Sequence, residues 1–223
     1  MSYTRFGIYY LPPDGPLAAF GAGWLGWDVV RGAAAKQPDL PDIEDVTATP
    51  RKYGFHGTLK PPFRLAPGMS QQALEEAIAA LVAVCAPAHC DGLTLTPLGR
   101  FLALTATGDA SGIGRVAADC VRDLDRFRAA PTDAELARRR KSGLTARQEA
   151  MLTAWGYPYV IEEFRFHMTL TGRLPRDRIG HWQDTLADHL PPLPAPFALD
   201  AVALVGERAD GCFELIRRYP LAG

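Results

Sequence analysis

The tetrapeptide His-x-Thr-Leu occurs twice in this chain, once starting at His56 and once at His167. Within each copy, His and Thr are two residues apart, which is the side-chain period of a β-strand. His56 and Thr58 should therefore share one strand face, as should His167 and Thr169. In-line cleavage of a phosphodiester needs a base, an acid and donors for the non-bridging oxygens. Two histidines and two hydroxyls facing one cleft would supply all three.

Side chains near the two motifs are expected to add substrate contacts. Lys60 continues the strand face of His56, whereas Arg165 and Thr171 share the face of the second motif. Lys60 and Arg165 could pair with an anionic substrate, or they could be solvated charges at strand ends. The predicted substrate-binding residues are Tyr10, Lys60, Arg139, Arg140, Lys141, Arg165 and Thr171.

Neither motif carries the ligand pattern of a two-histidine metal hydrolase, which usually includes a nearby carboxylate or third histidine. We therefore predict catalysis without a metal site and without a cofactor. The formal net charge of −1 argues against a large nucleic-acid surface, since such surfaces need a basic stripe.

The sequence also shows no signal-peptide pattern and no apolar run near the roughly 20 residues that span a bilayer. We predict a soluble cytoplasmic protein. Its partner would be a small phosphorylated or cyclic-phosphate substrate, not a membrane or an extended nucleic acid. The sequence leaves the oligomeric state open.

The order of predicted elements repeats along the chain. After a strand at 6–11, each half has a motif strand, an amphipathic helix and two further strands. The predicted strands are 52–60, 93–96 and 100–106 in the first half, and 159–171, 197–205 and 212–219 in the second. This order indicates an internal duplication. We expect one bilobal α+β domain over 1–223, with lobes at about 1–110 and 157–223. Two antiparallel sheets would face a central cleft, with helices outside.

A helical insert is predicted at about 111–156, between the two lobes. Thr132 with Glu135, and Thr145 with Gln148, fit the capping box that starts a helix. The insert leads into the second motif strand, so we expect it to lie over the cleft. Its basic run at 138–141 could contact substrate phosphates or could be a solvated helix end.

The doubled motif on duplicated halves resembles the two-histidine (2H) phosphoesterase superfamily, which includes RNA 2′-5′ ligase-like proteins and cyclic nucleotide phosphodiesterases. The resemblance implies a bilobal α+β fold, histidines as acid and base, and threonines as phosphate ligands. Segments 5–10, 22–26, 52–60 and 155–167 are similar to a bacterial branch of unassigned function. That branch resembles proteins encoded in phosphonate-utilisation operons.

The predicted function is therefore hydrolysis of a small cyclic phosphate or phosphodiester by two-histidine acid–base catalysis, within phosphonate metabolism. A ribose cyclic phosphate or a related sugar metabolite fits this context. One alternative is an RNA 2′,3′-cyclic phosphodiesterase or 2′-5′ RNA ligase-like enzyme, which the near-neutral charge disfavours. Another is a non-catalytic protein that binds a phosphate metabolite, although binding alone does not need two titrating groups. The sequence does not assign acid and base between His56 and His167.

Overall fold

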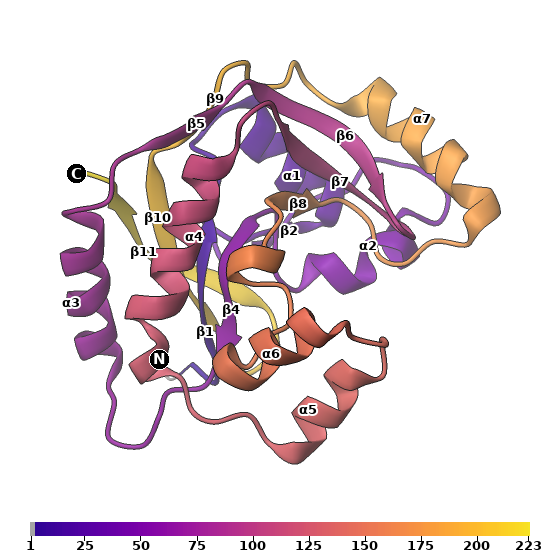
Figure 1. The fold of residues 1–223 in the computed structure, drawn as a ribbon. Coiled ribbons are helices and arrows are strands. Elements are labelled where there is room, and N and C mark those ends of the chain that lie inside the picture. The colour runs from indigo at the N-terminus through magenta and orange to yellow at the C-terminus, as the bar shows by residue number, and fades with distance from the viewer. Residues whose placement is uncertain (1–2) are drawn as a thin grey trace.

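The computed structural model describes residues 3–223, which form a mixed α+β fold around an antiparallel sheet (Figure 1). Seven strands lie in the order β11-β10-β1-β4-β8-β7-β6. They are β1 (Phe6–Tyr10), β4 (Gly57–Phe63), β6 (Gly92–Leu98), β7 (Phe101–Thr107), β8 (His167–Thr169), β10 (Ala201–Glu207) and β11 (Phe213–Pro220). Two small sheets pair β2 (Trp27–Asp28) with β3 (Ala33–Ala34), and β5 (Ala88–Cys90) with β9 (Phe197–Leu199). The predicted α+β class with antiparallel sheets is confirmed.

Helices surround this sheet. They are α1 (Pro16–Leu25), α2 (Ile43–Arg51), α3 (Gln71–Val82), α4 (Ser111–Asp123), α5 (Asp133–Arg140), α6 (Ala146–Trp155) and α7 (Ile179–His189). The helix α3 starts at Ser70, whose hydroxyl accepts a hydrogen bond from the Ala73 amide, as its N-cap position predicts. Within residues 3–223, no helix is both long and apolar enough to cross a membrane.

The two motif strands are neighbours at the centre of the sheet. They are joined by a single register pair, Gly57 opposite Met168. A Cβ atom on Gly57 would lie 2.5 Å from the Phe166 ring, so the close approach of the strands requires glycine in the first motif. The expected two sheets are therefore continuous through β4 and β8, and the motifs lie side by side.

The hairpins that follow the motif strands in sequence are exchanged in space. The hairpin β6–β7 pairs with β8, where Ala103 lies opposite Thr169. The hairpin β10–β11 instead extends β1, where Phe6 lies opposite Gly206. Each half of the sheet thus combines strands from both sequence halves, which corrects the expectation of lobes at 1–110 and 157–223. One edge of β4 is occupied by β1 and the other by β8, so β6–β7 has no free edge of β4 to join.

Both motif strands differ in extent from the ranges expected. The first begins at Gly57 and continues through Pro61 and Pro62, instead of covering 52–60 and ending at the prolines. Its pairing with β1 shifts register in this region, and prolines are tolerated at such irregularities. The second is only three residues long, because a 3₁₀ turn at Ile161–Glu163 precedes it.

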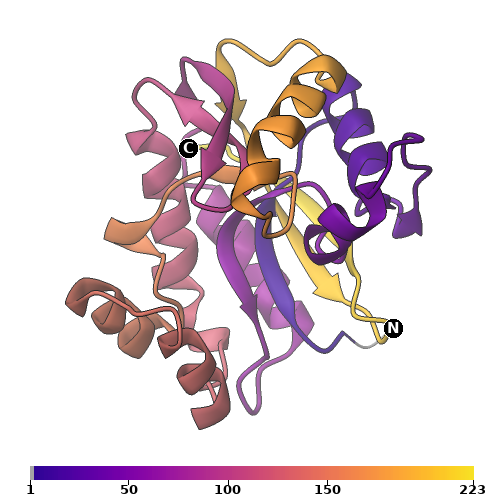
Figure 2. The same ribbon diagram turned by 90° about the vertical axis from the view of Figure 1, so that its right-hand side faces the viewer.

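Only part of the expected insert stands apart from the core. The buried face of α4, which includes Ile113 and Cys120, packs into the main hydrophobic core. In contrast, α5 has no buried residue, and α5 and α6 lie beyond the arrowhead of β4 (Figures 1 and 2). Both predicted capping boxes are present, at Thr132 and at Thr145. The insert therefore consists of α5 and α6, with α4 belonging to the body of the domain.

Candidate active site

The four motif side chains line one cavity of about 360 Å³. His56 and Thr58 come from the entry to β4, and His167 and Thr169 from β8. Their approach follows from the pairing of these two strands and from the two-residue spacing within each motif. The structure thus brings together the residues that the sequence predicts as catalytic.

The His56 imidazole is fixed at both nitrogens. Its Nδ1 lies 2.9 Å from the Gly54 carbonyl oxygen, so we assign the proton to Nδ1, since a carbonyl only accepts. In this tautomer Nε2 is an acceptor, and the Thr58 hydroxyl donates to it over 2.9 Å. Burial, together with the nearby His167, lowers the pKa of His56 to about 4 despite the opposing effect of the Gly54 carbonyl. At neutral pH, His56 is therefore an uncharged base.

The turn before β4 that holds this carbonyl depends on glycine. Gly54 has a φ of 70°, in the left-handed region, and a Cβ there would lie 2.5 Å from the Val29 side chain. Both the backbone conformation and the close packing exclude larger residues. The turn thereby sets the orientation of the imidazole two residues later.

His167 repeats the same backbone arrangement. Its Nδ1 lies 2.8 Å from the Arg165 carbonyl oxygen, again two residues upstream, so Nδ1 donates and Nε2 is left for the cavity. The nearest aromatic ring is Phe101, at 5.9 Å between centroids. The exposed Arg165 side chain does not line the cavity, which corrects its prediction as a substrate ligand. Its contribution is the backbone carbonyl.

Tyr9, and not the predicted Tyr10, belongs to this cavity. The Tyr9 ring stacks on His56 at 3.8 Å with an interplanar angle of 19°. Its side chain is 0% exposed, and its hydroxyl has no hydrogen-bond partner within residues 3–223. Tyr10 faces the other side of β1 and packs against Phe166 and Phe197, because successive strand residues alternate between faces.

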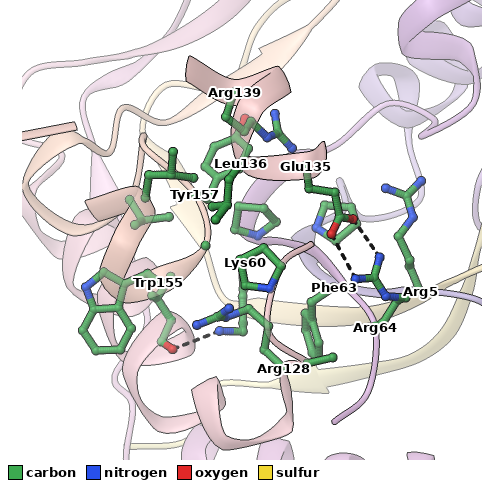
Figure 3. A pocket seen from close by; sticks show the side chains of 18 of the residues that line it. Arg5, Lys60, Phe63, Arg64, Arg128, Glu135, Leu136, Arg139, Trp155 and Tyr157 are labelled. Atoms are coloured by element: carbon green, nitrogen blue, oxygen red, sulfur yellow. Dashed lines mark hydrogen bonds and ion pairs between the residues drawn. The ribbon is translucent and has the colours of Figure 1, made fainter. Parts of the chain in front are cut away.

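Lys60 also lies on the opposite face from the one predicted. The pairing of β1 with β4 shifts by one residue between Tyr9–Thr58 and Ile8–Lys60, which marks a β-bulge. The extra residue reverses the alternation, so Lys60 points away from the motif cavity. Its ammonium donates to the Val121 carbonyl oxygen at 3.0 Å, and burial lowers its pKa to about 8. Lys60 lines a smaller pocket of about 70 Å³ (Figure 3).

Of the predicted basic run, only Arg139 lines the motif cavity. The Arg140 guanidinium pairs with Glu149 at 2.6 Å, and Lys141 is exposed at the end of α5. The prediction of Arg140 and Lys141 as substrate ligands is therefore corrected. Side chains on a helix point in different directions, so a consecutive run does not share one face.

Thr171 lines the cavity, but its hydroxyl is already engaged. It accepts a hydrogen bond from the Leu102 amide at 3.0 Å and donates to the Gly172 carbonyl at 3.0 Å. Its side chain is 0% exposed. The geometry therefore supports a structural role, holding the end of the second motif against β7, in place of the predicted substrate contact.

Several other lining residues were not predicted as ligands from the sequence. They include Arg5, Tyr9, Tyr53, Phe101, Tyr157 and Arg173. Strand alternation could have identified three of them, because Arg5 and Tyr9 share a face and Arg173 continues the spacing of the second motif. Within residues 3–223, no three or more His, Cys, Asp or Glu side chains gather in a metal-binding arrangement.

Comparison with known proteins places this site in a family. A family model described as "Protein of unknown function (DUF1045)" matches residues 58–214. A ribose 1,5-bisphosphate phosphokinase PhnN from Janthinobacterium sp. (strain Marseille) is 38% identical over 234 residues, covering 100% of this chain and 52% of that protein. A protein of the same name from Laribacter hongkongensis (strain HLHK9) is 35% identical over 193 residues, covering 83% and 44%. The chain spans about half the length of these curated relatives.

Two solved structures of E. coli LigT, complexed with NADP+ and with 3′-AMP, are also similar over the whole of both chains. Their TM-scores are 0.44 and 0.47, with 12% and 13% sequence identity. These values are low, so neither structure bears on the reaction of this chain. The family model and the curated relatives confirm the predicted resemblance to a bacterial branch of the 2H phosphoesterases: the chain belongs to the DUF1045 family.

Proposed function

We propose that this protein is a phosphoesterase that opens a small cyclic phosphate by two-histidine acid–base catalysis. The observation that carries the proposal is the paired arrangement of His56 and His167 in one cavity. Each ring donates through Nδ1 to a carbonyl two residues upstream. The Nε2 atom of His56 then accepts from the Thr58 hydroxyl, and that of His167 is left for the cavity. A phosphorus atom between two such nitrogens would have a base on one side and an acid on the other.

In the proposed reaction, His56 is the base and His167 is the acid. The low pKa of His56 keeps its Nε2 unprotonated at neutral pH. A water oxygen attacks phosphorus and transfers its proton to this nitrogen. The bond from phosphorus to one ring oxygen breaks, and that oxygen takes the proton from Nε2 of protonated His167. The product is a phosphomonoester beside a free hydroxyl.

The threonine hydroxyls are suited to hold the phosphate during this step. The Thr58 hydroxyl donates to His56 in the absence of substrate, and can turn to a non-bridging oxygen when His56 takes up a proton. Thr169 lines the same cavity beside His167. Neutral donors of this kind stabilise charge that develops on the phosphate oxygens.

The names of the relatives suggest the substrate class. They are described as kinases of ribose 1,5-bisphosphate, a sugar with a phosphate next to the free 2-hydroxyl. Opening a 1,2-cyclic phosphate of ribose 5-phosphate at the O2–P bond would yield this compound. The matched half of these relatives would then supply the substrate for the kinase that their name describes.

A kinase role for the present chain is a weaker proposal. ATP-dependent kinases of the P-loop class use a Gly-x-x-x-x-Gly-Lys-Ser/Thr loop to hold nucleotide phosphates, and this sequence has no such segment. We therefore attribute the kinase name to the part of the relatives outside the matched region. RNA cyclic phosphodiesterase activity remains the alternative substrate choice for the same chemistry.

The test is turnover of a substrate panel followed by phosphorus NMR. The panel contains ribose 1,2-cyclic phosphate with and without a 5-phosphate, nucleoside 2′,3′-cyclic phosphates, and ribose 1,5-bisphosphate with ATP. We expect the cyclic sugar phosphate signal to be replaced by that of a phosphomonoester. Consumption of ATP without ring opening would overturn the proposal, and preference for the nucleoside substrates would favour the RNA alternative.

A further inference from the structure

The cavity with the two histidines adjoins the smaller pocket shown in Figure 3. Arg5, Pro61, Pro62, Arg139 and Tyr157 line both. Six cationic side chains and one carboxylate, that of Glu135, line the smaller pocket. Its cationic lining residues are Arg5, Lys60, Arg64, Arg128, Arg138 and Arg139. Arg5, Lys60, Arg64 and Arg128 pair with carboxylates, so within residues 3–223 only Arg138 and Arg139 of this lining have none within ion-pair distance. Of these two, Arg139 also lines the motif cavity.

Arg139 is held at this junction by the rest of α5. Glu135, one helical turn earlier on the same face, forms two hydrogen bonds with Arg64, at 2.7 and 3.0 Å (Figure 3). The Arg139 guanidinium carbon lies 4.4 Å from the centre of the Tyr157 ring, which supports it by a cation–π contact. Within residues 3–223, no carboxylate lies within ion-pair distance of Arg139. A fixed cation thus faces the cavity without a counter-ion.

The Tyr9 hydroxyl provides an independent sign that a hydrogen-bond acceptor belongs at this cavity. Tyr9 is among the lining residues, and its fully buried hydroxyl has no hydrogen-bond partner within residues 3–223. A Cβ on Gly7 would lie 2.9 Å from the Tyr9 ring, so the ring passes over Gly7 toward the start of β1, where Arg5 stands. A buried donor without an acceptor costs free energy, which an anionic oxygen would recover.

We propose that Arg139 and the Tyr9 hydroxyl form a second anion subsite, which binds a phosphomonoester on the same molecule as the cyclic phosphate. The subsite rests on the proposed function and narrows its substrate class to phosphorylated cyclic phosphates. A phosphomonoester fits because a guanidinium can donate two parallel hydrogen bonds to it, and because its remaining oxygen can accept from the hydroxyl. Binding energy from this distant group would hold the reacting phosphorus between the histidines.

The kinetic test compares two substrates that differ only in the distant phosphate: ribose 1,2-cyclic phosphate with and without a 5-phosphate. The variants are Arg139→Gln and Tyr9→Phe, which keeps the stacked ring. Arg140→Gln, which breaks the pair with Glu149, is the matched control for Arg139→Gln. We expect Arg139→Gln to reduce the preference in kcat/KM for the phosphorylated substrate by about 10- to 100-fold, the usual worth of a charge-assisted contact.

Tyr9→Phe should reduce the same preference by a smaller factor, and Arg140→Gln should leave it at the wild-type value. The proposal is overturned if Arg139→Gln lowers kcat/KM equally for both substrates. It is also overturned if Arg139→Gln and Arg140→Gln change the preference to the same extent. Circular dichroism spectra verify that the variants remain folded.

A binding experiment separates this proposal from the proposed function. Calorimetry with ribose 5-phosphate, which has no cyclic phosphate to open, measures the subsite even if neither cyclic substrate is turned over. We expect Arg139→Gln to weaken this binding by at least about tenfold relative to Arg140→Gln. No binding to the wild-type protein, or equal binding by the two variants, would reject the subsite whatever the outcome of the turnover assay.

Discussion

The two His-x-Thr motifs share a backbone arrangement but have different surroundings. In both, Nδ1 donates to a carbonyl two residues upstream, at 2.9 Å for His56 and 2.8 Å for His167. Only His56 lies under a stacked ring, with Tyr9 at 3.8 Å, and only His56 accepts from the threonine of its own motif. The duplicated pattern thus supplies two histidines with the same backbone contact, and their different neighbours make them chemically unequal.

Removing either imidazole should have the largest effect on catalysis. We expect His56→Asn and His167→Asn each to reduce kcat by about 10²- to 10⁴-fold, the usual contribution of general acid–base catalysis. Asparagine keeps a donor for the carbonyl that each Nδ1 contacts, so the backbone turn should persist. Stopped assays on the cyclic phosphate measure the loss. A variant with near wild-type kcat would eliminate its histidine from the mechanism.

Leaving-group chemistry should distinguish the two variants. A phosphodiester with a p-nitrophenolate leaving group needs no acid, because that group departs as a stable anion. We therefore expect this substrate to restore much of the rate to His167→Asn but not to His56→Asn. The reverse pattern would exchange the roles of acid and base, and equal restoration would mean that the difference between the motifs has no catalytic consequence.

The acidic limb of the pH profile of kcat/KM should reflect the burial of His56. A base with a pKa of about 4 stays active well below the ordinary histidine pKa of about 6.5. We expect kcat/KM to decline only as the pH falls through about 4. Tyr9→Leu, which removes the stacked ring and admits water, should move this limb upward. A wild-type limb near 6.5 would refute the assignment of His56 as the enclosed base.

The same pKa has a consequence for stability. Because the folded-state pKa lies below the unfolded value, the unfolded chain binds more protons between about pH 4 and 6.5. The contribution of His56 is fully favourable above about 6.5 and is lost progressively as the pH falls toward 4. Urea denaturation at pH 7 and pH 5 should therefore show a smaller decrease for His56→Asn than for the wild-type protein.

Gly57, the variable residue inside the first motif, should give a smaller effect, and on the free energy of unfolding instead of on catalysis. Gly57→Ala places a Cβ 2.5 Å from the Phe166 ring, and overpacking of this kind costs about 1–3 kcal/mol in free energy of unfolding. Gly180→Ala, which meets open space in α7, is the matched control and should not destabilise. Phe166→Leu should recover part of the loss in Gly57→Ala. Urea denaturation midpoints measure each value, and equal midpoints for the two alanine variants would contradict the crowding argument.

Chelation should have the smallest effect. If the two histidines supply both proton transfers, dialysis against EDTA should leave the rate unchanged, and added zinc or manganese should not raise it. A rate that is lost on chelation and restored by one of these ions would show that the motifs act as metal ligands. The assignment of His56 as the base and His167 as the acid would then be wrong.

The sequence identified the motif residues because their spacing matches the period of a strand. His56 and Thr58 come to one face even though His56 lies just before β4, as the hydrogen bond between their side chains shows. Helix starts were also predictable, as the hydroxyls of Ser70, Thr132 and Thr145 accept hydrogen bonds from the first turns of their helices. These features depend on residues close together in the chain.

The incorrect predictions involve register and partners that are distant in sequence. Lys60 was placed on the wrong face because the bulge in β4 depends on its pairing with β1, which local spacing does not reveal. The choice of Tyr10 over Tyr9 depends on which face of β1 meets the cavity, and local spacing does not reveal this either. Arg139 could not be separated from Arg140 until the pair between Glu135 and Arg64 set the orientation of α5.

The exchanged hairpins have a consequence for synthesis of the protein. Among the described strands β1 is synthesised first, and it obtains one of its two neighbours only when β10 has been made, since Phe6 pairs with Gly206. Such distant pairing slows folding and delays cooperative closure of the sheet. Both motif histidines are therefore synthesised before the sheet that surrounds them can close.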